Sequence, residues 1–129
     1  MAVEDLTKAI NENPANADAW YNRAVVWFDL RMPELAKKDL EEAYKYNISI
    51  ETSKRIAEHI IKSGYYKEAE FIYLETLAHY PESTEIYEAL ASIYNYFGDN
   101  EKARNAYDKA LKYSNMTEES NTKEEVNEK

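Results

Sequence analysis

Residues 87–110 read YEALASIYNYFGDNEKARNAYDKA, and this stretch decides the fold. Its first half places four residues on one face of a helix, at i, i+3, i+4 and i+7: Tyr87, Leu90, Ala91 and Tyr94. Gly98 then ends that helix, and Asp99 or Asn100 can cap the next one. The second half puts Ala103, Tyr107, Ala110 and Leu111 on one face of the next helix. The stretch therefore predicts two helices that approach closely at alanines, with rings filling the space around them.

The pattern recurs along the chain with a period of 33 or 34 residues. Ala24, Ala57 and Ala91 form one column, with spacings of 33 and 34. A second column contains Ala2, Ala36, Ala69 and Ala103. Three more columns keep the same period: Ala9, Ala43, Thr76 and Ala110; Leu6, Leu40, Tyr73 and Tyr107; Pro14, Ile48, Pro81 and Asn115. A shared period in five columns indicates an internal repeat of helix pairs.

These columns resemble the tetratricopeptide repeat family, whose signature is W-x2-L-G-x2-Y, then A-x3-F, A and P. YEALASIY and ARNAY, followed by Ala110, match it closely, while WYNRAVVW with AKKDL and SKRIAEHI with AEFIY match more loosely. The chain departs from the signature at Arg23, where leucine is usual, and at Ser53, where the first aromatic is usual. The proline position holds Ile48 and Asn115. The small-residue columns that permit packing are all kept.

The resemblance implies an all-α fold, a right-handed superhelical solenoid of half a repeat followed by three full repeats. We expect residues 1–115 to form the repeat domain, with a half repeat at 2–16 and full repeats at 17–49, 50–83 and 84–115. We expect seven helices, near 2–12, 17–30, 33–46, 50–63, 66–79, 83–97 and 100–113. Residues 116–129 are rich in Glu and nearly without apolar residues, so we expect an acidic disordered tail.

Composition excludes several classes of function. The 129 residues contain no cysteine and carry a net charge of −9, which excludes thiolate metal sites and disfavours nucleic acid as a partner. Two glycines are too few for a phosphate-binding loop. No apolar run reaches the roughly 20 residues of a membrane span, and the acidic start is unlike a signal peptide. We expect a cytoplasmic protein that is not an enzyme, binds no cofactor, metal or membrane, and uses His59 and His79 as ordinary helix residues.

A binding surface is predicted on the first helix of each repeat, at repeat positions 2, 5, 9, 12 and 13, opposite the face that packs on the second helix. In this family that side lines a concave groove that binds peptides or partner helices. The expected groove residues are Tyr21, Val25, Phe28, Lys54, Arg55, Glu58, Ile61, Lys62, Asn95 and Tyr96. They give an aromatic end, a basic middle and a polar end. The alternative is that Lys54, Arg55 and Lys62 simply pair with Glu51 and Glu58 on a solvated face.

Two functions remain open. The first is non-catalytic binding of a protein or peptide partner in the groove. Chaperone-tail recognition, known in this family, is disfavoured because the positions that would hold the terminal carboxylate are Tyr21, Val25, Arg55, Glu85 and Ala89. The alternative is a self-assembling scaffold or homodimer joined through an uncapped N-terminal edge. Residues 17–30 are apolar nearly all round, and Tyr21, Val25 and Phe28 would be central to that contact.

Overall fold

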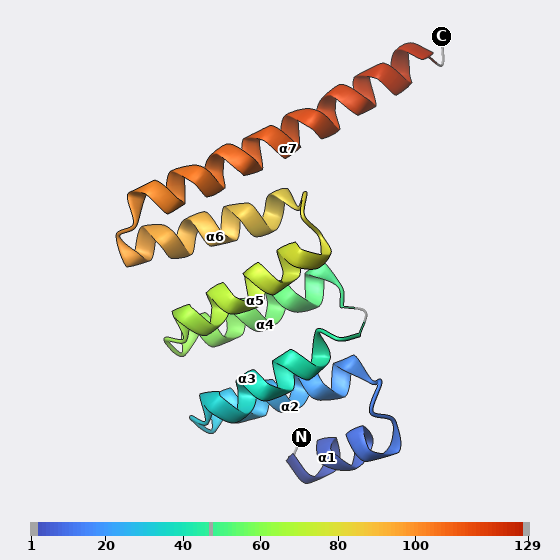
Figure 1. Ribbon diagram of the computed structural model, residues 1–129, viewed down its shortest axis with the longest axis vertical. Coiled ribbons are helices and arrows are strands. Elements are labelled where there is room, and N and C mark those ends of the chain that lie inside the picture. Colours follow the sequence, from blue (N-terminus) through green and yellow to red (C-terminus); the bar gives the residue numbers. More distant parts are fainter. Residues whose placement is uncertain (1–2, 47, 128–129) are drawn as a thin grey trace. The chain divides into compact units, whose positions relative to one another are not determined.

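The computed structural model describes residues 3–46 and 48–127, with side chains described as far as Met116. Within these ranges the chain forms seven α-helices and no strand (Figure 1). The helices are α1 (Val3–Glu12), α2 (Ala17–Asp29), α3 (Pro33–Ala43), α4 (Ile50–Lys62), α5 (Tyr66–His79), α6 (Thr84–Phe97) and α7 (Asn100–Asn127). This confirms the all-α helical repeat class. The chain divides into two compact units, an N-terminal unit, Met1–Thr76, and a C-terminal unit, Leu77–Lys129.

The first helix of each repeat begins at a side-chain cap. Asn16, Ser49 and Ser83 accept hydrogen bonds from the backbone N–H groups of Ala19, Thr52 and Ile86. The three caps are themselves 33 and 34 residues apart, so they form a further column of the repeat. Each satisfies one of the backbone donors that a helix N-terminus leaves unpaired. The predicted cap of the last helix is confirmed, because Asp99 Oδ1 accepts from Lys102 N at 3.1 Å.

The turn between the helices of a pair uses one left-handed residue. Gly64 and Gly98 have φ of 92° and 78°, and the equivalent residue of the first repeat is Arg31, with φ of 63°. A non-glycine residue in this region is strained. Here the Arg31 guanidinium donates to the backbone oxygen of Ser63 at 2.9 Å and lies 5.5 Å from the centre of the Tyr65 ring. These contacts tie the α2–α3 turn to the end of α4 and offset the strain.

We predict that Arg31→Ala destabilises the chain by about 1 kcal/mol more than Arg31→Gly. Both variants lose the contacts to Ser63 and Tyr65, but only alanine keeps a Cβ at positive φ. Urea unfolding of the two proteins measures the difference. Gly64→Ala is the matched control, since a Cβ there meets no atom within 4 Å and strain is the only cost. Equal stability of the two Arg31 variants would contradict the strain argument.

The alanine columns lie at the helix contacts, where α2 packs on α1 and α3 and α6 packs on α7. Ala24, Ala36, Ala57 and Ala69 have no exposed surface. Ala91 and Ala103, predicted to be almost fully buried, are 0% and 3% exposed, which confirms the assignment. Side chains larger than alanine at these points would hold the helix axes apart.

The last helix is longer than predicted. Residues 100–113 were expected to be helical, and α7 continues to Asn127. It runs antiparallel beside α6 and extends beyond it (Figure 1). The chain after Gly98 contains no further glycine or proline to end a helix, and Glu and Lys are strong helix formers. The acidic disordered tail expected over residues 116–129 stays a prediction. At the other helix ends the predicted bounds differ by at most three residues.

Candidate functional site

Possible metal ligands do not cluster among the described residues. Among them no group of three or more His, Cys, Asp or Glu side chains gathers where it could hold a metal ion. None of the described helices is long and apolar enough to cross a membrane. His59, one of two histidines, lies 2.9 Å from Asp29 Oδ1 in an exposed contact between α4 and α2.

Two of the predicted groove residues are in the core. Tyr21 and Phe28 are each 1% exposed. The Tyr21 hydroxyl lies 3.5 Å from Ser53 Oγ of α4, and its ring meets the Tyr44 ring edge-on at 5.7 Å. The Phe28 ring packs on Tyr65 at 5.1 Å. The aromatic end of the predicted groove is therefore a contact between neighbouring repeats, and burial raises the pKa of the Tyr21 hydroxyl far above its ordinary value.

The error has a simple geometric cause. The prediction gave each first helix a single neighbour, but α2 packs both on its partner α3 and on α4 of the next repeat. In the first repeat, Tyr21 and Phe28 at positions 5 and 12 turn toward that next repeat, so the exposed surface of α2 and α4 lies at positions 2, 6, 9 and 13. We call this surface the α2–α4 stripe and include in it His59, which contacts Asp29 of α2. Its residues are Asp18, Asn22, Val25 and Asp29 of α2, and Glu51, Arg55, Glu58, His59 and Lys62 of α4.

The stripe retains four of the predicted residues: Val25, Arg55, Glu58 and Lys62. Val25 is half-buried and the other three are exposed. Lys54 and Ile61, at positions 5 and 12, are half-buried. Asn22 and His59 were missed. The sequence did contain a signal for them. Positions 5 and 12 of the first repeat hold aromatic residues, which is typical of core positions, and this would have moved the predicted exposed face toward Asn22 and His59.

The last two predicted residues, Asn95 and Tyr96, belong to α6 in the C-terminal unit. Both are exposed, and Tyr96 is 63% exposed. Asn95 Nδ2 donates to the Tyr107 hydroxyl at 3.2 Å, which links α6 to α7. The Tyr96 ring meets Phe97 edge-on at 6.0 Å. An aromatic surface therefore exists on α6, whereas the one predicted on α2 does not.

The charges of the α2–α4 stripe are only partly paired. His59 and Asp29 join the two helices across the stripe. The spacing of Glu51 to Arg55 and of Glu58 to Lys62 would allow i, i+4 pairing. Among the described residues, however, neither Arg55 nor Lys62 forms an ion pair. Two exposed cations are thus available to a carboxylate from another molecule.

A second polar cluster is structural. Arg23 donates from Nε and Nη2 to the two oxygens of Asp39, both at 2.8 Å, and from Nη1 to Thr7 Oγ1 at 3.1 Å. The bond to Asp39 raises the pKa of Arg23. The Arg23 and Asp39 side chains are 18% and 5% exposed, and the contacts join α1, α2 and α3. This pairing explains why arginine replaces the leucine usual at this repeat position.

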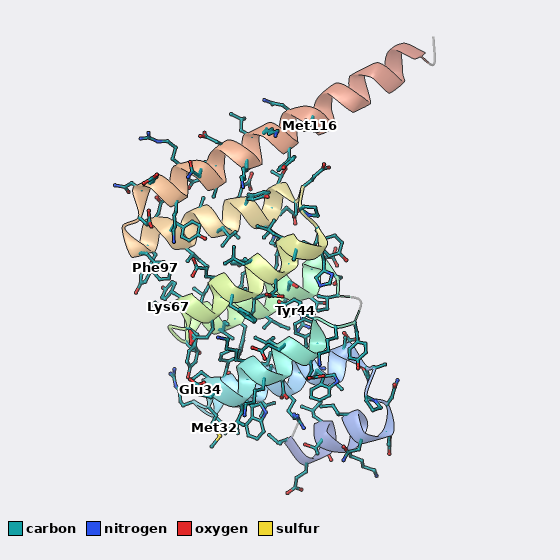
Figure 2. The ribbon with its side chains drawn as sticks, in the orientation of Figure 1. Met32, Glu34, Tyr44, Lys67, Phe97 and Met116 are labelled. Carbon is teal, nitrogen blue, oxygen red and sulfur yellow. The ribbon has the colours of Figure 1, made fainter. Side chains whose placement is uncertain are left out.

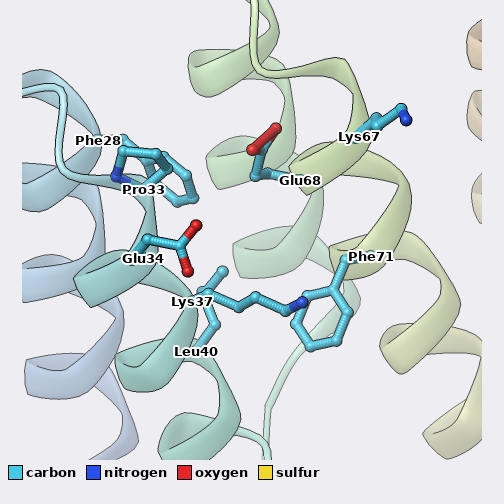
Figure 3. A pocket seen from close by; sticks show the side chains of 8 residues that line it. All are labelled: Phe28, Pro33, Glu34, Lys37, Leu40, Lys67, Glu68 and Phe71. Atoms are coloured by element: carbon cyan, nitrogen blue, oxygen red, sulfur yellow. The ribbon is translucent and has the colours of Figure 1, made fainter.

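The second helices α3 and α5 enclose a small pocket of about 160 Å³ (Figure 3). Its apolar residues are Phe28, Pro33, Leu40 and Phe71, and its charged residues are Glu34, Lys37, Lys67 and Glu68. Lys37 lies across Phe71, with its Nζ 5.3 Å from the ring centre, while Lys67 points away from the space between the helices. The volume is below the roughly 300–1,000 Å³ of small-molecule sites, so the pocket can take no more than one side chain of a partner.

The N-terminal edge differs from the prediction that it is uncapped and apolar. Leu6 and Ile10 of α1 are buried, and α1 packs on α2. No large hydrophobic side chain of α1 among the described residues is exposed. Since Tyr21 and Phe28 are buried as well, the centre of the predicted self-assembly contact is missing. Exposed apolar residues of the N-terminal unit lie instead at Leu30, Met32, Leu35 and Leu74, with Met32 at the α2–α3 turn (Figure 2).

Two buried tyrosines predict a loss of stability at high pH. Burial raises the pKa of Tyr44 to about 12 and that of Tyr73 to about 12. Above about pH 10 the tyrosine ionises in the unfolded chain but stays protonated in the folded one. The contribution of the protonated tyrosine to stability is therefore complete below about pH 10 and is lost as the pH rises toward 12. We expect the free energy of unfolding to fall across this window, and to fall less steeply in Tyr44→Phe. Urea unfolding at a series of pH values gives the two slopes, and identical slopes would contradict the prediction.

Comparisons with known proteins agree with the repeat pattern. A family model described as Tetratricopeptide repeat matches residues 17–47 and 84–115. A crystal structure of MamA matches with a TM-score of 0.56 and 18% identity, covering 86% of this chain and 66% of that one. MamA MSR-1 matches with a TM-score of 0.56 and 20% identity, covering 89% and 67%. MamA AMB-1 matches with a TM-score of 0.54 and 21% identity, covering 85% and 61%. At these identities the likeness concerns the fold.

The chain spans about two thirds of the length of the MamA chains that it matches. A comparison with curated proteins found no match.

Proposed function

Because this chain belongs to the tetratricopeptide repeat family, whose repeats are generally protein-interaction modules, we propose that it is a non-catalytic module that binds a protein partner through the α2–α4 stripe. The observation that carries the proposal is the pair of exposed cations without an ion-pair partner, Arg55 and Lys62 on α4. They are seven residues apart, so they lie two turns from each other on the same helix face.

The stripe also selects the chemistry of the partner. Val25 of α2, half-buried and equivalent in the repeat to Glu58, offers a small apolar contact between the two charged helices. Asp18 and Asp29 repel anions from the two ends of α2. A fitting segment presents carboxylates to Arg55 and Lys62, clear of Glu51 and Glu58 on the same helix, and an aliphatic side chain to Val25. Because exposed ion pairs are weak, such contacts give moderate affinity and marked salt dependence.

The experiment uses a charge reversal on the stripe. The purified chain, an Arg55→Glu/Lys62→Glu variant and a Lys37→Glu/Lys67→Glu variant are each immobilised and exposed to cell extract. Captured proteins are identified by mass spectrometry. We expect proteins that the wild type and the Lys37/Lys67 control retain but the Arg55/Lys62 variant loses, and the acidic segment of such a protein then binds the wild type as a synthetic peptide.

The control matches the test variant in the number and kind of charges changed, but its lysines lie on the second helices. Equal capture by both variants would place the binding elsewhere on the chain and overturn the proposed stripe. Circular dichroism of both variants checks that they remain helical. Since all four lysines and arginines are exposed, we expect no loss of fold.

A further inference from the structure

The second helix of the last repeat exposes residues whose equivalents in the first repeat are buried. Tyr107 stands in the column of Leu40 and Tyr73, which are 0% and 2% exposed, yet Tyr107 is 47% exposed. Leu111 stands in the column of Tyr44, which is 6% exposed, and of Leu77, which is half-buried, yet Leu111 is 62% exposed. The sequence predicted Tyr107 to lie in the core. On α7 a face with core-type side chains is therefore open to solvent.

The N-terminal unit shows what covers this face elsewhere. The Tyr44 hydroxyl of the first repeat donates to Ile72 O at 3.2 Å, and its ring meets Phe71 edge-on at 6.3 Å. Leu40 lines the pocket that α5 closes. The cover at these two columns is thus another helix. A helix is also the natural cover for Tyr107 and Leu111.

The charges on this face of α7 are self-complementary. Arg104, Tyr107, Asp108, Leu111 and Lys112 follow the spacing i, i+3, i+4, i+7 and i+8 and so share one side of the helix. If a second α7 lies antiparallel, with a two-fold axis between residues 109 and 110, Tyr107 and Leu111 of the other copy differ in level by one residue, about 1.5 Å, and so lie in contact distance. The same axis brings Asp108 close to Lys112 of the other copy, and Lys112 close to Asp108. Each contact is made twice, as an isologous interface requires.

We propose that the chain forms a two-fold dimer through antiparallel pairing of α7, centred on Tyr107 and Leu111. A contact between this face and α1 of another copy is less favourable, because α1 has no exposed large hydrophobic side chain. A parallel α7 pair is also excluded, since it places Asp108 against Asp108 and Lys112 against Lys112. The proposal is independent of the α2–α4 stripe, which lies in the other unit.

Sedimentation equilibrium tests the proposal. With one helix per copy the interface is at the small end of specific contacts, so we expect a dissociation constant on the order of 10–100 µM. Leu111→Glu weakens dimerisation at least tenfold. Leu74→Glu is the matched control, because Leu74 is a leucine on a second helix with 47% exposure, and it leaves the constant unchanged.

Charge exchange tests the antiparallel register. Asp108→Lys alone weakens the dimer about fivefold, because it places two lysines together. Asp108→Lys combined with Lys112→Asp restores the affinity to within about twofold, since the pair is re-formed with its signs exchanged. All of these residues are exposed, so the variants stay folded, as circular dichroism can verify.

Crosslinking supplies a second measurement. The natural chain has no cysteine, so Leu111→Cys introduces a single thiol close to the proposed two-fold axis. We expect mild oxidation to give a covalent dimer from Leu111→Cys but little from Leu74→Cys. A wild type that stays monomeric at 1 mM, or a dimer that survives Leu111→Glu, would overturn the proposal.

Discussion

In a chain with Asp39→Ala, the free energy of unfolding falls by about 3 kcal/mol. The substitution leaves the Arg23 guanidinium without the two oxygens that it bonds at 2.8 Å. The Arg23 side chain is only 18% exposed, so water replaces those oxygens poorly. The residual exposure places the expected loss at the lower end of the range for a broken buried pair. Urea unfolding at pH 7 measures it.

A double substitution separates the cost of leaving Arg23 unpaired from the net contribution of the Arg23–Asp39 pair to stability. We expect Arg23→Leu/Asp39→Leu to regain most of the stability lost in Asp39→Ala, because apolar residues of similar volume cost less than one unpaired buried charge. Lys45→Ala removes a cation from an exposed pair with Glu42 and should leave the unfolding curve unchanged. A loss in Asp39→Ala as small as that of Lys45→Ala would show that the pair contributes nothing.

The repeat could be predicted from sequence because its alanine columns lie at close helix contacts, where only a small side chain fits. An alanine at a helix contact excludes every larger side chain, so Ala24, Ala57 and Ala91 keep their spacing while their neighbours change. Glycine at Gly64 and Gly98 has an equally local cause in positive φ. Features of this kind are properties of one helix pair and can be seen without knowing what surrounds it.

Other features depend on neighbours that sequence order does not reveal. Tyr21 and Phe28 were assigned to a groove because the repeat pattern describes only the contact between the two helices of a pair. It does not show that the next repeat covers another side of α2. Arg23 looked like a departure from the repeat until Asp39, 16 positions later, supplied its partner. Arg31 occupies a glycine column, and its contacts with the Ser63 carbonyl and the Tyr65 ring explain it. In each case the missing information is a contact between repeats or between helices.

We expect the strongest contrast in stability from two leucines of the same kind of helix. Leu40 of α3 is 0% exposed and Leu111 of α7 is 62% exposed. Leu40→Ala should lower the free energy of unfolding by about 3–4 kcal/mol, since it removes buried methyl groups and leaves a cavity beside Phe28 and Phe71. Leu111→Ala should cost less than about 0.5 kcal/mol when the chain is monomeric.

Denaturant unfolding at low micromolar concentration keeps self-association from contributing to either value. Because the substitution is chemically identical, helix propensity and unfolded-state effects largely cancel between the two variants. The remaining difference between the two losses in stability measures how much the next repeat contributes by covering Leu40. If Leu111→Ala were as costly as Leu40→Ala in the monomer, some element of the chain would have to cover α7 in solution, and the exposed face on which the α7 dimer depends would not exist.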